Sequence, residues 1–145
     1  MSAEYLLRDY LKKQDIKDIE VDSAGTLANP QPLNPYVLSE LSSYGVDASR
    51  HKLKKVTKKM IESSDVALVM ADYNREFIEE KFGIKVQLFN EFCYGKSTSV
   101  KDVSDAVLDW EHDKKASNLY TKKTIRYLHD SMPYLAKKLM LIKDA

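Results

Sequence analysis

The chain has 145 residues, of which 43% are hydrophobic and 31% are charged, a balance that excludes an intrinsically disordered protein. Its 23 basic and 22 acidic side chains leave a formal net charge of +1, so no overall charge attracts nucleic acid or an anionic membrane. No apolar run approaches the roughly 18 residues of a membrane helix, and charges interrupt the first residues, where a signal peptide is apolar. We therefore expect a cytoplasmic protein with no nucleic-acid and no membrane partner.

The N-terminal part of the chain predicts one helix and one short strand. In residues 3–14 the apolar side chains recur at helical spacing, with basic side chains on the opposite face. Residues 19–22 alternate apolar and acidic side chains, as a half-buried strand does. The small residues of the segment 23–26 follow directly, so we expect a turn at the end of this strand.

The next segment predicts a loop and two helices. Residues 29–35 contain three prolines and two asparagines, including Asn29 and Pro30, and predict an irregular loop. Asn34 is placed to cap a helix over residues 35–44 that starts with proline and has glycine beyond its end. Thr57 is placed to cap a short basic helix.

The strongest strand signal is the continuous apolar run at residues 66–70, which is typical of a buried parallel strand. A helix is predicted over residues 72–82, ended by Gly83, and a short strand over residues 86–88. From residue 120 onward, apolar side chains at steps of three and four predict a long C-terminal helix. Its tyrosines fall seven residues apart and are predicted to pack: Tyr120, Tyr127 and Tyr134.

Strands and helices alternate along the chain, which implies parallel strands joined by right-handed crossovers. We therefore expect an α/β fold, a three-layer sandwich with a small parallel sheet and helices on both faces. The sequence shows neither an internal repeat nor a linker, so residues 1–145 are predicted to form one domain.

Three stretches of the sequence together resemble the low-molecular-weight protein tyrosine phosphatase family. They are the turn at residues 22–26, the segment 45–51 and the strand segment 65–70. Residues 1–8 also look like the family's first helix, which follows its phosphate-binding loop. The order and spacing of these motifs match over nearly the whole chain, and the resemblance implies a Rossmann-type fold of the phosphotyrosine phosphatase class.

The resemblance also implies a segment that this sequence lacks. Family members carry, before the first helix, a buried strand and a loop of pattern Cys-x5-Arg-Ser. The backbone N–H groups and the Arg of this loop hold the phosphate while the Cys thiolate attacks phosphorus. The sequence begins directly at the helix, so we expect the chain as given to be an inactive, N-terminally truncated phosphatase. This chemistry uses no metal and no cofactor, and we expect neither.

Cys93 is the only cysteine, and in our interpretation it does not replace the missing nucleophile. The residue six positions later is Ser99 instead of Arg, and Cys93 follows the strand at residues 86–88 instead of preceding the first helix. A single cysteine also excludes an internal disulfide and argues against the arsenate reductases of this fold, which relay a disulfide. We expect a partly buried, inert thiol.

Four residues are candidates for the site. The resemblance implies a general-acid Asp before the last helix, followed by Pro and an aromatic residue. Asp102 lies at that point, with Asp105 as the second choice, but Val103 replaces the proline and no aromatic residue follows. Ser23 and His51 match the family residues that hydrogen-bond to the phosphate loop and support it. The alternatives are a solvated loop carboxylate for Asp102 and an ordinary loop histidine for His51.

Two classes of function follow. In the first, the complete form hydrolyses phosphotyrosine in a phosphorylated protein, or a small phosphomonoester, through a cysteinyl-phosphate. Met1 is then an internal methionine and the natural protein begins upstream, the interpretation that we favour. In the second, the chain is a non-catalytic pseudophosphatase remnant that binds a protein partner or an anion. The coding sequence directly upstream of Met1 distinguishes the two.

The missing strand would lie between residues 19–22 and residues 66–70. Buried backbone groups without partners cost about 1–3 kcal/mol each, so an empty gap at this position is not tolerable. Besides an upstream strand, two arrangements would close the gap. The two flanking strands would pair directly, or a second chain would fill the gap and give a homo-oligomer by strand exchange.

Overall fold

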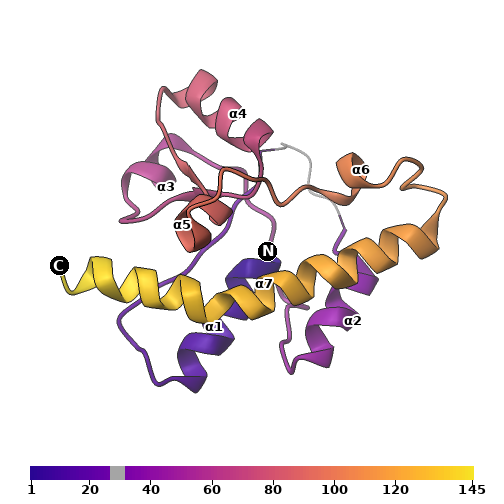
Figure 1. Cartoon of the computed structure of the whole chain (residues 1–145), viewed down its shortest axis with the longest axis horizontal. Coiled ribbons are helices and arrows are strands. Elements are labelled where there is room, and N and C mark those ends of the chain that lie inside the picture. The colour runs from indigo at the N-terminus through magenta and orange to yellow at the C-terminus, as the bar shows by residue number, and fades with distance from the viewer. Residues whose placement is uncertain (27–31) are drawn as a thin grey trace.

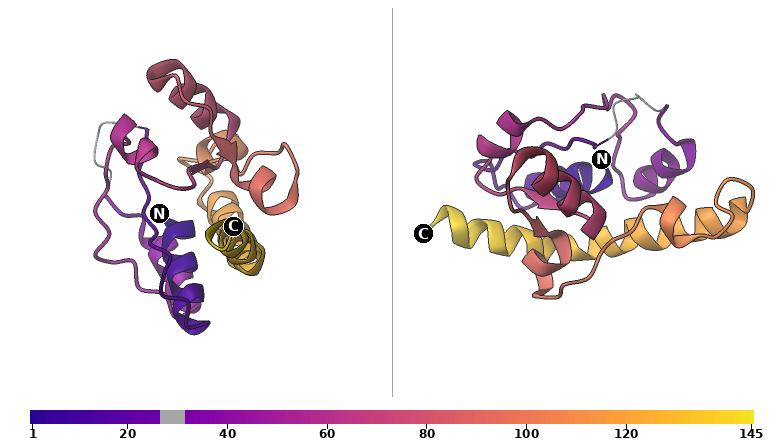
Figure 2. Two further views of the ribbon diagram at one scale, coloured as in Figure 1. Left: turned by 90° about the vertical axis from the view of Figure 1, so that its left-hand side faces the viewer. Right: turned by 90° about the horizontal axis from the view of Figure 1, so that it is seen from above.

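The computed structural model describes residues 1–26 and 32–145, so Asn29 and Pro30 of the predicted loop lie outside the described residues. In chain order, its elements are α1 (Ser2–Lys13), α2 (Pro35–Ser43), α3 (Lys58–Glu62), β1 (Leu68–Val69), α4 (Asp72–Phe82), β2 (Gln87–Leu88), α5 (Phe89–Tyr94), α6 (Val103–Ala106) and α7 (Lys114–Lys143). The long helix α7 runs along the molecule (Figure 1) and contacts α1, α2, α5 and α6. Viewed along α7, the helices α1 and α2 lie on one side of it (Figure 2). The helix α7 therefore packs against helices from both the N-terminal and the C-terminal half of the chain.

Several helix ends follow from capping residues that the sequence predicted. The Asn34 side chain accepts a hydrogen bond from the Tyr36 N–H at 2.9 Å, and Thr57 Oγ1 accepts one from the Met60 N–H at 3.2 Å. Gly83 ends α4 in a left-handed conformation with φ 68°, which glycine adopts without strain. The predicted starts of α2 and α3 and the predicted end of α4 are therefore confirmed.

Three features of the helices differ from the prediction. The helix α7 begins at Lys114, six residues before the predicted start, because Asp113 accepts a hydrogen bond from the Ala116 N–H at 3.0 Å and caps it. Its first turns are mostly polar, so hydrophobic periodicity does not detect them. The short helix α5 follows β2 without a loop, and Glu91 Oε2 accepts from the Leu88 N–H at 3.2 Å at its start. The helix α6 was also not predicted.

The sheet is small and parallel, with Leu68 opposite Gln87 and Val69 opposite Leu88. The predicted strand at residues 19–22 is wrong, because no ladder joins it to another described segment. Only an isolated parallel bridge between Gly25 and Lys55 follows it. An alternating pattern needs a neighbouring strand to form a ladder, and the described part of the chain supplies none here. The direct pairing with residues 66–70, one of the arrangements considered above, is absent from the described structure.

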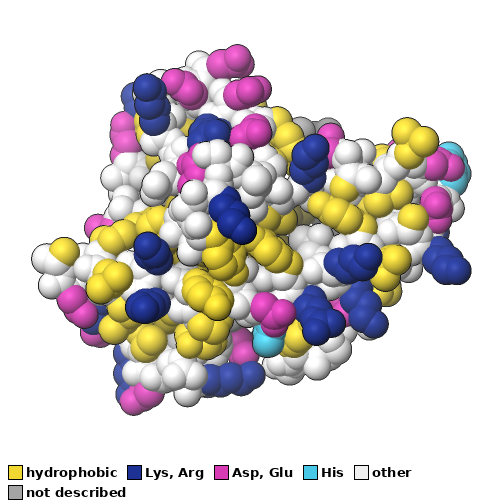
Figure 3. Space-filling view, viewed as in Figure 1, with side chains coloured by type: hydrophobic (Ala, Val, Ile, Leu, Met, Phe, Trp, Pro, Cys, Tyr) yellow, Lys and Arg dark blue, Asp and Glu magenta, His cyan; other side chains and the backbone are white. Residues whose placement is uncertain are grey.

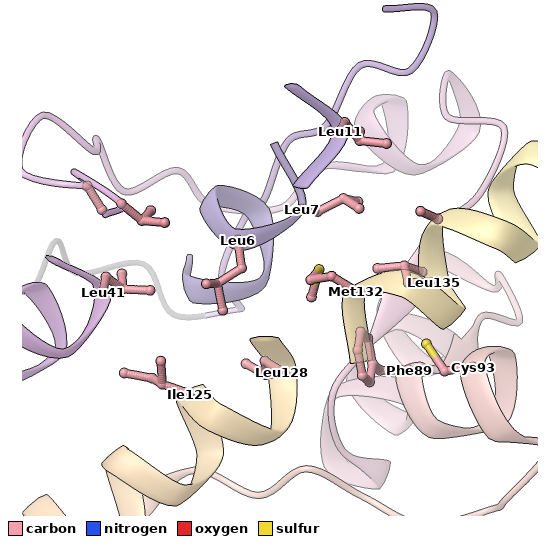
Figure 4. Close-up of a cluster of buried hydrophobic side chains, with 13 residues drawn as sticks. Leu6, Leu7, Leu11, Leu41, Phe89, Cys93, Ile125, Leu128, Met132 and Leu135 are labelled. Carbon is pink, nitrogen blue, oxygen red and sulfur yellow. The ribbon is translucent and has the colours of Figure 1, made fainter. Parts of the chain in front are cut away.

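The hydrophobic core lies between α1 and α7 (Figure 4). The helix α1 contributes Leu6, Leu7 and Leu11, and α7 contributes Ile125, Leu128, Met132 and Leu135. In contrast, residues 66–70 are only partly buried, although their composition is that of a fully buried strand. The strand with the most apolar sequence therefore does not lie at the centre of the core.

The helix α7 buries one side in this core and exposes a mixed surface on the other. Tyr134 and Leu141 are exposed, and hydrophobic side chains lie between Lys and Arg side chains across this face (Figure 3). Although α7 has 30 residues, none of the helices in the described ranges combines the length and the hydropathy needed to cross a membrane.

Candidate active site

A buried carboxylate, Glu4, connects two of the predicted site residues. Its side chain is only 3% exposed and pairs with Arg8, with 2.6 Å between Oε2 and Nη1. Ser23 Oγ donates a hydrogen bond to Glu4, and His51 Nδ1 lies 3.8 Å from Glu4 Oε1. Ser23 and His51, which are distant in the sequence, therefore meet at the first turns of α1.

The imidazole of His51 packs against Tyr5 in an edge-to-face arrangement. The ring centroids are 5.4 Å apart at 81°, and His51 Nδ1 lies 3.3 Å from the Tyr5 hydroxyl. Burial lowers the pKa of His51, while the charge of Glu4 acts in the opposite direction. Burial therefore favours the neutral imidazole, and in the tautomer with its proton on Nε2 the Nδ1 atom accepts a hydrogen bond from Tyr5.

The predicted acid loop runs beside the C-terminal end of β1. Ser99 Oγ accepts from the Asp72 N–H at 2.9 Å, and the Val100 N–H donates to the Met70 carbonyl at 2.7 Å. These two bonds attach the loop to the junction between β1 and α4. The loop therefore has a defined position, although it contains no proline.

Asp102 is exposed and lies directly before α6, and Asp105 is in the first turn of that helix. The amino group of Met1 reports where Asp102 lies. Burial lowers the pKa of this amino group, and the charges of Glu4 and then Asp102 act to raise it. The charge of Asp102 therefore contributes to the pKa shift of this amino group, after the larger contribution of Glu4. Ser23 and His51 lie at the first turns of α1, and the charge of Asp102 acts on the amino group at the same helix end.

Cys93 lies away from this cluster, in α5, where it packs with Phe89 and Leu135 in the core (Figure 4). Burial raises the pKa of the Cys93 thiol to about 11, so the nucleophilic thiolate is scarce at neutral pH. Among the described residues, no three His, Cys, Asp or Glu side chains are grouped so that they could hold a metal ion.

Sequence reasoning missed three side chains of this region: Glu4, Tyr73 and Tyr120. For Glu4 a signal exists, because it lies three and seven residues before Leu7 and Leu11 and therefore on the apolar face of α1. A carboxylate on such a face needs a buried partner. For Tyr73 and Tyr120 the contacts are distant in sequence, and no local pattern marks them.

A family model described as low molecular weight phosphotyrosine protein phosphatase matches residues 1–142. Among solved structures, the chain is similar to YwlE arginine phosphatase in a mutant form with a phosphorylated active-site serine. The two share 24% identity with a TM-score of 0.80, over 96% of this chain and 86% of that chain. A comparison with curated proteins found no match.

Two tyrosine phosphatases are also similar. A low molecular weight protein tyrosine phosphatase from T. tengcongensis shares 25% identity over 94% of this chain and 88% of that chain, with a TM-score of 0.76. The solution structure of one from Bacillus subtilis shares 25% identity over 96% of this chain and 87% of that chain, with a TM-score of 0.74. These structures confirm the predicted α/β fold with a small parallel sheet. By its family match, the chain belongs to the low molecular weight phosphotyrosine protein phosphatases.

Proposed function

We propose that this chain is the acid-bearing part of a cytoplasmic phosphotyrosine phosphatase domain, and that hydrolysis requires a Cys-x5-Arg loop that the 145 residues do not contain. The observation that carries the proposal is the cluster at the start of α1. Ser23 and His51 meet there through Glu4, and Asp102 lies near, while the thiol of Cys93 is buried elsewhere. In this proposal Ser23 and His51 are the supporting residues and Asp102 is the acid, and the nucleophile belongs to the Cys-x5-Arg loop.

In the complete site, the thiolate of the added loop would attack phosphorus and form an S–P bond. The P–O bond to the phenol would break, and Asp102 would give its proton to the leaving phenolate. Water would then attack the cysteinyl-phosphate, so that inorganic phosphate and the thiolate are released. Ser23 and His51 would hold the added loop by hydrogen bonds and touch no reacting atom. Neither step requires a metal or a cofactor.

The test compares hydrolysis of p-nitrophenyl phosphate by the 145-residue chain and by a form extended upstream to restore the loop. We expect activity in the extended form alone, and an Asp102→Asn variant of that form should be slower by about 100-fold or more. An Asp105→Asn variant decides between the two carboxylates. Activity in the short chain that Cys93→Ser abolishes would overturn the proposal, since the buried thiol would then be the nucleophile.

The substrate class is the second part of the proposal. We infer a phosphorylated tyrosine in a protein, or a small aryl phosphate, because a carboxylic acid placed near the start of α1 suits a leaving group that needs a proton. Similar structures include arginine phosphatases as well as tyrosine phosphatases. The extended form should therefore be assayed on phosphotyrosine and phosphoarginine peptides of one sequence. Faster turnover of phosphoarginine would contradict the substrate class and leave the mechanism intact.

A second candidate is a non-catalytic function in which the chain accepts a strand from another molecule. The observation that favours it is the sheet, because β1 pairs only with β2 in the described structure and residues 66–70 remain partly exposed. Such an edge pairs readily with another strand, including one from a second copy in a strand-exchanged oligomer. Light scattering after size-exclusion chromatography tests this candidate. A monomer at all concentrations would count against the oligomer.

A further inference from the structure

Two tyrosines hold the two polar groups of a single peptide bond in the acid loop. The Tyr73 hydroxyl accepts a hydrogen bond from the Asp102 N–H at 3.0 Å. The Tyr120 hydroxyl donates one to the Lys101 carbonyl oxygen at 2.5 Å. Because this N–H and this carbonyl belong to the same planar unit, the two bonds fix the orientation of the peptide that leads into Asp102.

The two tyrosines come from different parts of the fold. Tyr73 lies in the first turn of α4, directly after β1, and Tyr120 lies in the second turn of α7. The same loop is attached one and two residues earlier by the Val100 N–H and by Ser99 Oγ. The consecutive residues 99–102 are therefore each held by one hydrogen bond, to α4, to α7 or to Met70 directly after β1.

We propose that Tyr73 and Tyr120 are positioning residues for the acid of this site. Their two hydrogen bonds to the Lys101–Asp102 peptide constrain the loop, as a proline would do. The inference rests on the proposed function above. Val103 follows Asp102, and a valine restricts the backbone far less than the proline that the family resemblance implies. A loop without proline needs other constraints to keep its carboxylate in one position. Hydrogen bonds from two helices, α4 and α7, supply these constraints.

The state of the Tyr73 hydroxyl suits this role. Burial raises the pKa of Tyr73, and the carboxylates of Asp102 and Asp105 raise it further, against the effect of the Asp102 N–H. Tyr73 therefore keeps its proton throughout the neutral range. A protonated phenol accepts from the Asp102 N–H and still has its own proton to donate, so it does not repel the neighbouring carboxylates.

The first arm of the test uses the 145-residue chain and needs no activity. Solvent exchange of the Asp102 amide proton is measured by NMR in the unchanged chain and in Tyr73→Phe. We expect exchange to become about tenfold faster in Tyr73→Phe, because the acceptor is lost. The control is Tyr134→Phe, since Tyr134 is on α7 like Tyr120 but is exposed to solvent. Unchanged exchange in Tyr73→Phe would overturn the inference.

The second arm measures leaving-group dependence in the extended form with the loop restored. A misplaced acid slows hydrolysis of esters of weakly acidic phenols, which need a proton, far more than esters of strongly acidic phenols. We expect Tyr73→Phe and Tyr120→Phe to slow phenyl phosphate about tenfold and to change a dinitrophenyl phosphate less than twofold. An equal loss on both substrates would indicate general structural damage and overturn the positioning role.

The two arms separate the inference from the function on which it rests. If the extended form has no activity, the proposed function fails, and the amide exchange still decides whether the tyrosines hold the loop. If the extended form is active and both tyrosine variants keep the leaving-group dependence of the unchanged enzyme, the proposed function stands and the positioning role fails. Tyr120→Phe provides a second variant if Tyr73→Phe does not fold.

Discussion

Replacing Glu4 by alanine tests whether the buried network at the start of α1 stabilises the fold. The change leaves Ser23 without its acceptor and Arg8 without its carboxylate partner, while Arg8 keeps its hydrogen bonds to the Val21 carbonyl. A hydrogen bond to a charged group contributes about 1.5–3 kcal/mol, and breaking a fully buried ion pair costs about 3–5 kcal/mol. Because Arg8 is 47% exposed, the ion-pair contribution is reduced by solvent. We expect the free energy of unfolding to fall by about 2–4 kcal/mol.

A matched control exists on the same helix. Asp9 and Lys13 form an ion pair of the same spacing, with 2.8 Å between Oδ2 and Nζ, but their side chains are 27% and 61% exposed. Asp9→Ala should therefore lower the free energy of unfolding by no more than about 0.5 kcal/mol. Urea denaturation followed by far-UV circular dichroism measures both variants. If Glu4→Ala lowers the free energy of unfolding no more than Asp9→Ala does, burial does not determine the strength of this network and the reasoning is wrong.

Three further predictions concern individual side chains. Burial lowers the pKa of His51, so the unfolded chain takes up a proton at a higher pH than the folded one. The free energy of unfolding should therefore fall as the pH drops below 6.5. A His51→Gln variant should make this dependence of stability on pH less steep. Burial raises the pKa of Cys93 from 9.0 to about 11. Ellman's reagent should therefore react at least about 100-fold more slowly with the folded protein than with the urea-unfolded protein. A fast reaction of the folded protein would place this thiol at the surface. Leu41 is completely buried, so Leu41→Ala should cost about 2–5 kcal/mol in denaturation experiments, whereas exposed Leu119→Ala should stay within about 0.5 kcal/mol.

Features of the fold that depend on neighbouring residues were predictable from the sequence. Asn34, Thr57 and Gly83 each act within four residues of their own position, and each marks a helix end as predicted. The alternation in residues 19–22 predicted a strand that does not form. A ladder depends on what lies beside the segment in space, and hydrophobic alternation contains no information about that.

The same distinction applies to the candidate site. Ser23, His51 and Asp102 are predicted from motif order along the chain, and the structure brings Ser23 and His51 to the start of α1, where the charge of Asp102 also acts. What holds them could not be predicted, because each contact depends on how separate elements pack. The seven-residue spacing of tyrosines on α7 predicted packing, and it did not reveal that the Tyr120 hydroxyl reaches the Lys101 carbonyl. A motif indicates which residues matter, whereas their partners follow from the tertiary fold.

The contact between α1 and α7 has a consequence for how the protein is made. These two helices share most of the core, yet one begins at residue 2 and the other ends at residue 143. During synthesis the leucines of α1 leave the ribosome long before their partners in α7 exist, so the N-terminal helix cannot bury its apolar face at that time. The core that α1 and α7 share therefore forms only after the last helix has been synthesised.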